Sequence, residues 1–78
     1  MKALSIVGFA RDPRLEPKAG DIVERTGNLR AVIAVRHSPF AGKAFVSYRT
    51  ASIGTVGKVS IDAWRAWASS AAVTKVAA

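Results

Sequence analysis

The fold of this chain is decided by two runs of residues, Leu29-Arg30-Ala31-Val32-Ile33-Ala34-Val35-Arg36 and Lys43-Ala44-Phe45-Val46-Ser47-Tyr48-Arg49-Thr50. Both runs are rich in β-branched and aromatic residues, which favour strands. The six residues between them, 37–42, include Pro39 and Gly42, which favour a turn. The pattern therefore predicts a long antiparallel β-hairpin at the centre of the fold.

A six-residue loop fixes the expected register of this hairpin. Arg36 is then opposite Lys43, and Arg30 is opposite Arg49. Because side chains alternate between the two faces of a strand, one face is expected to carry Arg30, Val32, Ala34, Arg36, Lys43, Phe45, Ser47 and Arg49. The other face is expected to be core: Leu29, Ala31, Ile33, Val35, Ala44, Val46, Tyr48 and Thr50. Like charges opposite each other are mildly destabilising, so the pattern predicts a solvated face or an anionic partner.

The size of the chain limits its core. A domain of 78 residues buries roughly 60% of the surface that its unfolded chain exposes. Small domains often add disulfides, a metal ion or a second subunit for stability. With no cysteine and one histidine, the first two are not expected here. A homo-oligomer stays open.

Charge is the strongest compositional signal. Twelve Lys and Arg oppose five Asp and Glu, giving a net charge of +7, while 50% of the residues are hydrophobic. The hydrophobic content is typical of a globular domain rather than a disordered basic tail. A cationic protein of this kind attracts nucleic acid, anionic membranes or acidic proteins.

Targeting signals are not expected. The apolar run 3–10 is short and continues directly into Arg11-Asp12-Pro13-Arg14, unlike a signal peptide. No apolar run approaches the roughly 20 residues that cross a bilayer, and the lack of cysteine fits a reducing compartment. The sequence predicts a cytoplasmic protein with no membrane association.

The rest of the chain reads as short strands joined by turns. A first strand is expected over Lys2–Phe9, an irregular loop over Arg11–Gly20, and a strand over Asp21–Arg25 that ends in the turn Thr26-Gly27-Asn28. Gly20 is placed where a positive φ is needed. After the hairpin, the expected elements are a strand over Lys58–Ile61, a short helix over Asp62–Ala68 and a closing strand over Val73–Val76.

The start and the aromatic content of the short helix can also be predicted. Ser60 or Asp62 offers a side-chain oxygen that caps its first turn. Trp64 and Trp67 are three residues apart and lie on one side of the helix. They are expected to plug the open end of a small barrel, with a contact surface as the alternative.

Five to six short antiparallel strands with one short helix near the C-terminus predict an all-β fold, a small barrel rather than a sandwich. The expected organisation is one domain over 1–78, with an N-terminal strand and loop at 1–17 and the barrel core at 18–78. Gly20-Asp21-Ile22-Val23, the long hairpin and Val59-Ser60-Ile61-Asp62 before the helix together resemble SH3-like small barrels, including KOW and Tudor-type modules.

A weaker similarity is to the plasmid-type dihydrofolate reductases, whose barrel also opens on a Gly-Asp-x-Val turn. That family would imply a tetramer whose pore binds folate and a nicotinamide cofactor through a Val-Gln-Ile-Tyr segment. Here the matching residues are Val59, Ser60, Ile61 and Asp62. Both polar residues of the segment differ, and Asp62 would face an anionic cofactor, so this activity is not expected.

Other catalytic and cofactor patterns are also missing. Gly54-Thr55-Val56-Gly57-Lys58 lacks the first glycine and the final Ser or Thr of a phosphate-binding loop, and a Gly-x-x-Gly loop of the KH type would need flanking helices. His37, the sole histidine, is next to Ser38 and Pro39 in the expected loop, whereas a catalytic triad needs a nucleophile and a buried carboxylate that a rigid scaffold places. One histidine and five scattered acids do not form a metal site. The sequence therefore predicts that the protein is not an enzyme and that it binds no cofactor and no metal ion.

Two functions remain open. In the first, the protein binds DNA or RNA: the expected site residues are the phosphate-binding Arg30, Arg36, Lys43, Arg49 and Lys58 together with Phe45, on whose ring a base stacks. The competing explanation for Phe45 is burial by the N-terminal strand or another subunit. In the second function, the protein is an interaction module, such as a phage or mobile-element accessory protein that binds or inhibits a host protein. It would present the hairpin edge or the loop Arg11–Lys18 to an acidic protein surface.

Overall fold

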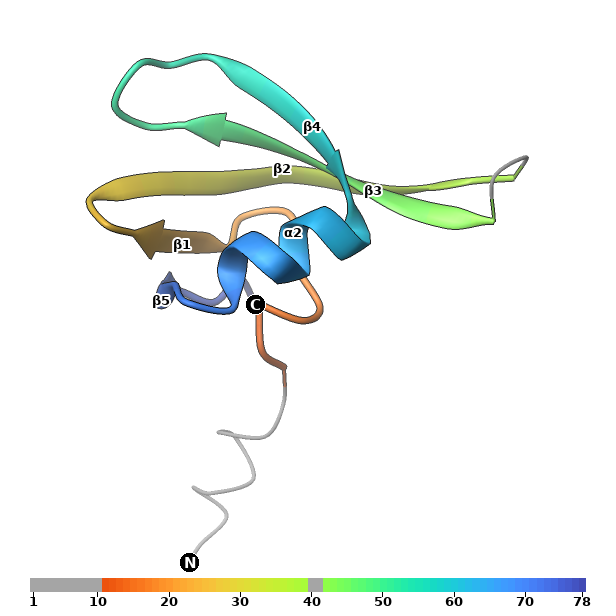
Figure 1. The fold of residues 1–78 in the computed structure, drawn as a ribbon, viewed down its shortest axis with the longest axis horizontal. Coiled ribbons are helices and arrows are strands. Elements are labelled where there is room, and N and C mark those ends of the chain that lie inside the picture. The colour runs from red at the N-terminus through yellow and green to blue at the C-terminus, as the bar shows by residue number, and fades with distance from the viewer. Residues whose placement is uncertain (1–10, 40–41) are drawn as a thin grey trace, which may run out of the picture.

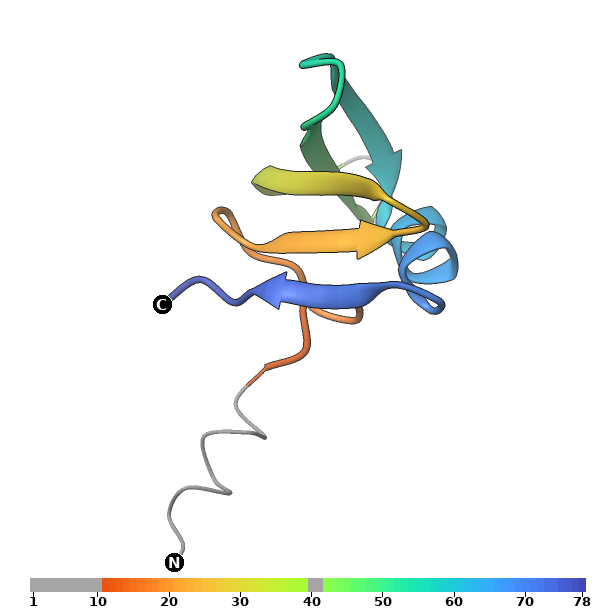
Figure 2. The same ribbon diagram turned by 90° about the vertical axis from the view of Figure 1, so that its left-hand side faces the viewer.

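The computed structural model describes residues 11–39 and 42–78. In this part of the chain, five strands form one antiparallel sheet in the order β4-β3-β2-β1-β5. They are β1 (Ile22–Arg25), β2 (Asn28–Ser38), β3 (Lys43–Thr50), β4 (Val56–Ser60) and β5 (Ala72–Lys75), and the helix α2 (Ile61–Ala68) lies between β4 and β5 (Figures 1 and 2). The predicted all-β fold with a short helix near the C-terminus is confirmed. The strand predicted over Lys2–Phe9 lies outside the described residues.

The first hairpin is set by its turn. Arg25 pairs with Asn28, so Thr26 and Gly27 alone connect β1 to β2. Both have positive φ, 47° and 84°, which is the backbone of the tight turns that match the twist of paired strands. The predicted turn at Thr26-Gly27-Asn28 is confirmed.

The register predicted for the central hairpin is wrong. β2 continues through Ser38, so the connection to β3 is shorter than expected, and Ser38 instead of Arg36 pairs with Lys43. Arg36 pairs with Phe45. Between the loop and Ala34, the pairing is therefore offset by two residues from the prediction, because His37 and Ser38 join the ladder and do not form part of the loop.

A β-bulge in β2 changes which residues share a face of the sheet. The register shifts between Val32 and Ala34, which leaves Ile33 without a partner and 43% exposed. An extra residue in one strand reverses the alternation beyond it. Val32 therefore lies on the core face with Tyr48, and Arg30 pairs with Thr50 on that same face, not with Arg49.

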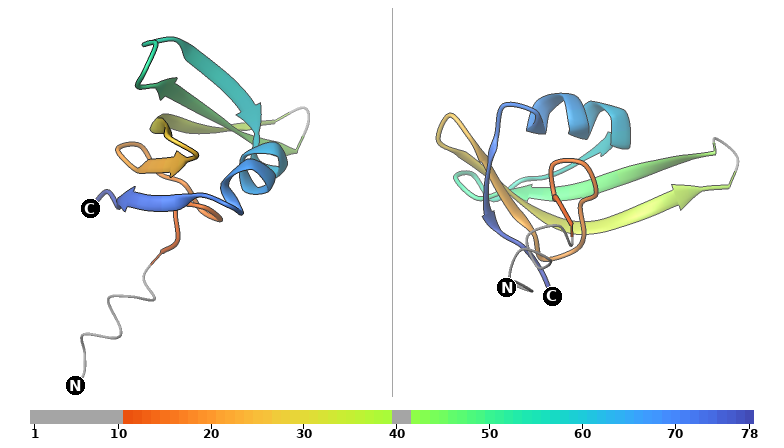
Figure 3. Two further views of the ribbon diagram at one scale, coloured as in Figure 1. Left: turned by 60° about the vertical axis from the view of Figure 1, so that its left-hand side comes forward. Right: turned by 90° about the horizontal axis from the view of Figure 1, so that it is seen from below.

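The core lies between the sheet and α2. Trp64 and Ala68 of the helix are fully buried against Val23, Val32 and Val46, which come from three neighbouring strands. Figure 3 (right) shows the helix on one side of the sheet and the β2–β3 hairpin extending beyond it. The helix therefore covers one face of the sheet and leaves the distal part of the hairpin uncovered.

Local hydrogen bonds define the helix and its tryptophans. The Ser60 hydroxyl accepts from the Ala63 amide at 3.1 Å, which confirms Ser60 as the N-cap. Trp64 donates through Nε1 to the Pro13 carbonyl at 3.0 Å. Trp64 is thus a core residue that also holds the N-terminal loop, whereas Trp67 is half-buried beside it.

The predicted irregular loop before β1 is confirmed and is anchored by a buried carboxylate. The Asp21 side chain is fully buried and accepts from the Arg11 guanidinium and from the amides of Lys18 and Ala77, both at 2.7 Å. Gly20, with φ of 99°, turns the chain into this position, as predicted. Burial on its own raises the pKa of Asp21, but the Arg11 and amide hydrogen bonds together outweigh burial and hold this pKa below its ordinary value.

Within residues 11–39 and 42–78, the structure contains no helix with the length and hydropathy that crossing a bilayer requires.

Candidate nucleic-acid interface

Basic and acidic residues are separated along the sequence. Between Glu24 and Asp62 there is no acidic residue, but the segment carries Arg25, Arg30, Arg36, Lys43, Arg49 and Lys58. Asp12, Glu16 and Asp21 all lie in the loop before β1. The strands β2, β3 and β4 therefore hold a positive charge that no nearby residue in the sequence compensates.

Strand pairing places most of these cations on one side of the sheet. Three rows cross β2, β3 and β4 on the side away from α2: Arg36–Phe45–Ser60, Ala34–Ser47–Lys58 and Ala31–Arg49–Val56. Lys43, two residues from Phe45 on β3, lies on the same side. We call this surface, with Arg36, Lys43, Phe45, Ser47, Arg49 and Lys58, the outer face.

The outer-face cations are solvent-exposed and are not neutralised by acids. In the part of the chain that the structure describes, the salt bridges join Arg11 with Asp21 and Arg14 with Asp12. None involves a cation of the outer face. Hydrogen bonds from Arg14 lower the pKa of Asp12, so this carboxylate is held in an ion pair within the loop and does not neutralise the outer face.

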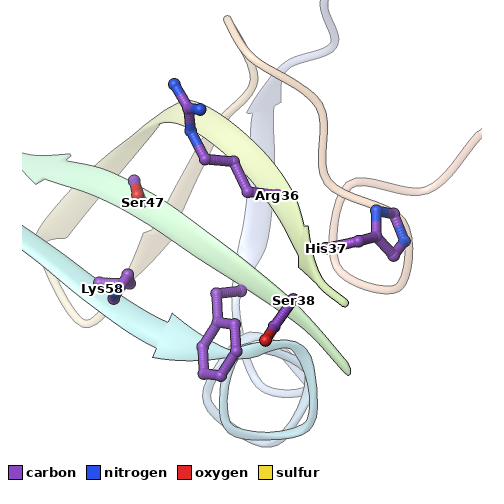
Figure 4. A pocket seen from close by; sticks show the side chains of 6 residues that line it. Arg36, His37, Ser38, Ser47 and Lys58 are labelled. Carbon is purple, nitrogen blue, oxygen red and sulfur yellow. The ribbon is translucent and has the colours of Figure 1, made fainter. Parts of the chain in front are cut away.

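A pocket lies across the outer face near the distal end of the hairpin. It has a volume of about 240 Å³ and is lined by Arg36, His37, Ser38, Phe45, Ser47 and Lys58. Figure 4 shows Arg36, Ser47 and Lys58 on three neighbouring strands, with His37 extending away from them. The Lys58 ammonium is 5.6 Å from the centre of the Phe45 ring, which is within the range of a cation–π contact.

Arg30 belongs to a different part of the molecule from the one predicted. Its guanidinium carbon lies 4.2 Å from the centre of the Tyr48 ring and 4.1 Å from that of Trp67. This stacking is on the α2 side of the sheet, so Arg30 is not part of the outer face. The bulge at Ile33 is the reason, since it reverses the alternation between Arg36 and Arg30.

The structure brings together the other five predicted residues and adds three that sequence reasoning missed. Arg36, Lys43, Phe45, Arg49 and Lys58 share the outer face. His37, Ser38 and Ser47 also line the pocket. Strand alternation places Ser47 on the same face as Phe45, so the sequence could have predicted Ser47 as a site residue. The sequence pattern predicts His37 and Ser38 in the loop, whereas both lie in β2.

Comparisons with other proteins do not assign a family. No known protein family matches this chain, and neither a curated protein nor a solved structure is significantly similar to it. Among the described residues there is also no cluster of three or more His, Cys, Asp or Glu side chains that could hold a metal ion.

Proposed function

We propose that this protein binds nucleic acid through the outer face of β2, β3 and β4. The observation that carries the proposal is the presence of four exposed cations, Arg36, Lys43, Arg49 and Lys58, on one face without an acidic partner among the described residues. Cations of this kind neutralise backbone phosphates and release the counterions condensed on them. The half-buried Phe45 ring among the cations adds a surface on which a base stacks.

The dimensions of the outer face fit several consecutive phosphates. Lys43 and Arg49 are six residues apart on β3, or about 20 Å at roughly 3.3 Å per residue. The phosphates of one strand of a duplex repeat about every 3.4 Å along its axis, so a face of this length spans about six of them. Four cations can thus each meet a separate phosphate.

Salt dependence of binding tests this proposal. With four phosphate contacts, the slope of log affinity against log salt is expected to be about −3 for a single strand and about −3.6 for a duplex. Substitution of one outer-face cation by alanine should reduce the slope by about 0.7 to 0.9. Fluorescence anisotropy of a labelled oligonucleotide measures this.

Lys75→Ala is the matched control. Lys75 is exposed on β5, at the opposite end of the strand order, and its removal changes the net charge by the same amount. It should leave the slope unchanged. Binding that is insensitive to salt, or equal slope losses in the control and in Arg36→Ala, contradicts the proposal.

We also infer that the fold is an SH3-like small barrel and that the chain is not an enzyme. The strand order β4-β3-β2-β1-β5 and the helix directly before β5 support the structural part of this inference. Assay of the purified protein for nuclease and nucleotide hydrolase activity tests the functional part. Turnover that is lost on substitution of a pocket residue contradicts it.

A second candidate function is binding of an acidic protein strand along β4. β4 is at one end of the strand order among the described strands. Its first residue, Val56, is 61% exposed, and Ile53 in the preceding turn is 70% exposed. Such an edge pairs readily with a strand from another chain. The loop Arg11–Lys18 is less suited to this role, because Arg11 and Arg14 are already paired with Asp21 and Asp12. Capture of one stoichiometric acidic protein from nuclease-treated lysate, lost in Val56→Asp, would favour this function.

A further inference from the structure

The outer-face pocket combines an aromatic ring with cations on two sides of it. Arg36 is the direct cross-strand neighbour of Phe45, and Lys58 is its diagonal neighbour on β4. Phe45 is half-buried and is not among the residues that form or pack against the hydrophobic core of the described chain. Its ring therefore lines a pocket on the outer face and is not part of the core.

The pocket has the size of one base. Its volume is about 240 Å³, whereas an engineered apolar cavity of about 150 Å³ is large enough to hold benzene. Sites for drug-sized ligands and whole cofactors have volumes of roughly 300 to 1,000 Å³. A nucleobase is somewhat larger than benzene, so it fits a pocket of about 240 Å³ better than a complete dinucleotide cofactor does.

The pocket lining matches the three chemical parts of a nucleotide chain. The Phe45 ring offers a π-face to a base, and the Arg36 and Lys58 side chains offer charge to the phosphates on either side of it. The Ser47 hydroxyl both donates and accepts hydrogen bonds, so it suits the edge of any base. This arrangement favours stacking that tolerates different sequences.

A base that stacks on Phe45 must leave its duplex neighbours. In a double helix both faces of each base are covered, so proteins stack aromatic side chains mainly on unpaired bases. We infer that the pocket binds an unstacked base, so that the protein prefers single-stranded over double-stranded nucleic acid. This inference rests on the proposed nucleic-acid binding and names its substrate class. The competing arrangement inserts the hairpin into the major groove of a duplex, which needs the cations but not the Phe45 ring.

The test compares Phe45 variants on matched oligonucleotides. A labelled single strand of about 12 nucleotides, within the usual range of site sizes, and the duplex of the same sequence are titrated with wild type, Phe45→Leu and Phe45→Trp. Phe45→Leu keeps an apolar side chain but removes the ring. It should weaken single-strand binding by about 5- to 150-fold and leave duplex binding and the salt slope unchanged. Phe45→Trp should restore single-strand affinity and show quenched fluorescence on binding.

The results distinguish failure of the inferred single-strand preference from failure of the proposed nucleic-acid binding. Equal affinity of wild type for single strand and duplex, or an unchanged single-strand affinity in Phe45→Leu, overturns the inference. In that case, a salt slope that is still reduced by about 0.7 to 0.9 in Arg36→Ala would support the proposed function. Absence of binding to either oligonucleotide overturns both. Far-UV circular dichroism and the thermal midpoint of each variant show that a loss of affinity does not reflect unfolding.

Discussion

Removal of the buried carboxylate of Asp21 should be the most damaging single polar substitution in the described fold. Asp21 Oδ1 accepts from Arg11 Nη2 at 2.8 Å and from the Ala77 amide at 2.7 Å, and Oδ2 accepts from Arg11 Nη1 and the Lys18 amide. In Asp21→Asn, the side-chain NH₂ group would face these donors, and the Arg11 guanidinium, only 18% exposed, would lose the carboxylate that it hydrogen-bonds. Breaking a buried ion pair from one side costs about 3 to 5 kcal/mol.

That loss is large for a domain of this size. At 0.05 to 0.15 kcal/mol per residue, the total stability is about 4 to 12 kcal/mol. Urea unfolding followed by tryptophan fluorescence measures the loss. Arg11→Lys keeps the charge but loses the two-pronged contact, and its smaller cost of about 1 to 2 kcal/mol remains measurable if Asp21→Asn does not fold. Glu16→Gln, the same charge change at an exposed position of the loop, should cost less than about 0.5 kcal/mol.

The pH dependence gives an independent check. The pKa of Asp21 is lower in the folded protein than its unfolded value of about 3.9. Its contribution to the free energy of unfolding is therefore complete above that unfolded value and is lost as pH falls toward the folded pKa. Wild type should lose more stability between about pH 5 and pH 2 than Asp21→Asn. Parallel pH profiles, or a cost in urea below about 1 kcal/mol, would refute the reasoning.

Two further predictions concern the α2 side of the sheet. A Cβ at Gly57 would lie 2.7 Å from Tyr48 Cζ, so Gly57→Ala should destabilise the protein by about 1 to 3 kcal/mol. Thermal unfolding should show a smaller cost for the same change in a Tyr48→Val background, and an equal cost would exclude the ring contact as the cause. Arg30→Ala should lose about 1 to 2 kcal/mol of stability with the stacking on Tyr48 and Trp67. The salt dependence of its oligonucleotide binding should equal that of wild type. A reduction in slope equal to that of Arg36→Ala would show that Arg30 also contacts phosphate.

Local sequence signals were sufficient for the elements themselves. Thr26-Gly27-Asn28 predicted the first tight turn, and the β-branched runs predicted the two long strands. The sequence offered Ser60 or Asp62 as the helix cap, and Ser60 is the residue that caps it. These features depend on a few neighbouring residues, so the sequence contains them directly. The register of β2 against β3 depends instead on which residues close the loop, and Ser38 is compatible with either a loop or a strand.

The β-bulge in β2 and the buried contacts of Asp21 were not predicted from the sequence. Val32 is buried in the core, and Val35, three positions away, packs against that core. A regular strand cannot place residues with this spacing on one face. In retrospect, this break in alternation is the mark of the bulge. The sequence predicts Asp21 only as the first residue of a strand and does not predict its burial, because one of its partners, Ala77, is 56 positions away. Only the tertiary structure brings them together.

The central claim is that nucleic acid binds the outer face of β2, β3 and β4. Amide chemical-shift mapping of ¹⁵N-labelled protein, titrated with a single strand of about 12 nucleotides, tests it most directly. We predict that the largest shifts occur around Arg36, Phe45 and Lys58, with small shifts in α2. The largest shifts in α2 and β5, or no shifts at a concentration that saturates an anisotropy titration, would contradict the account.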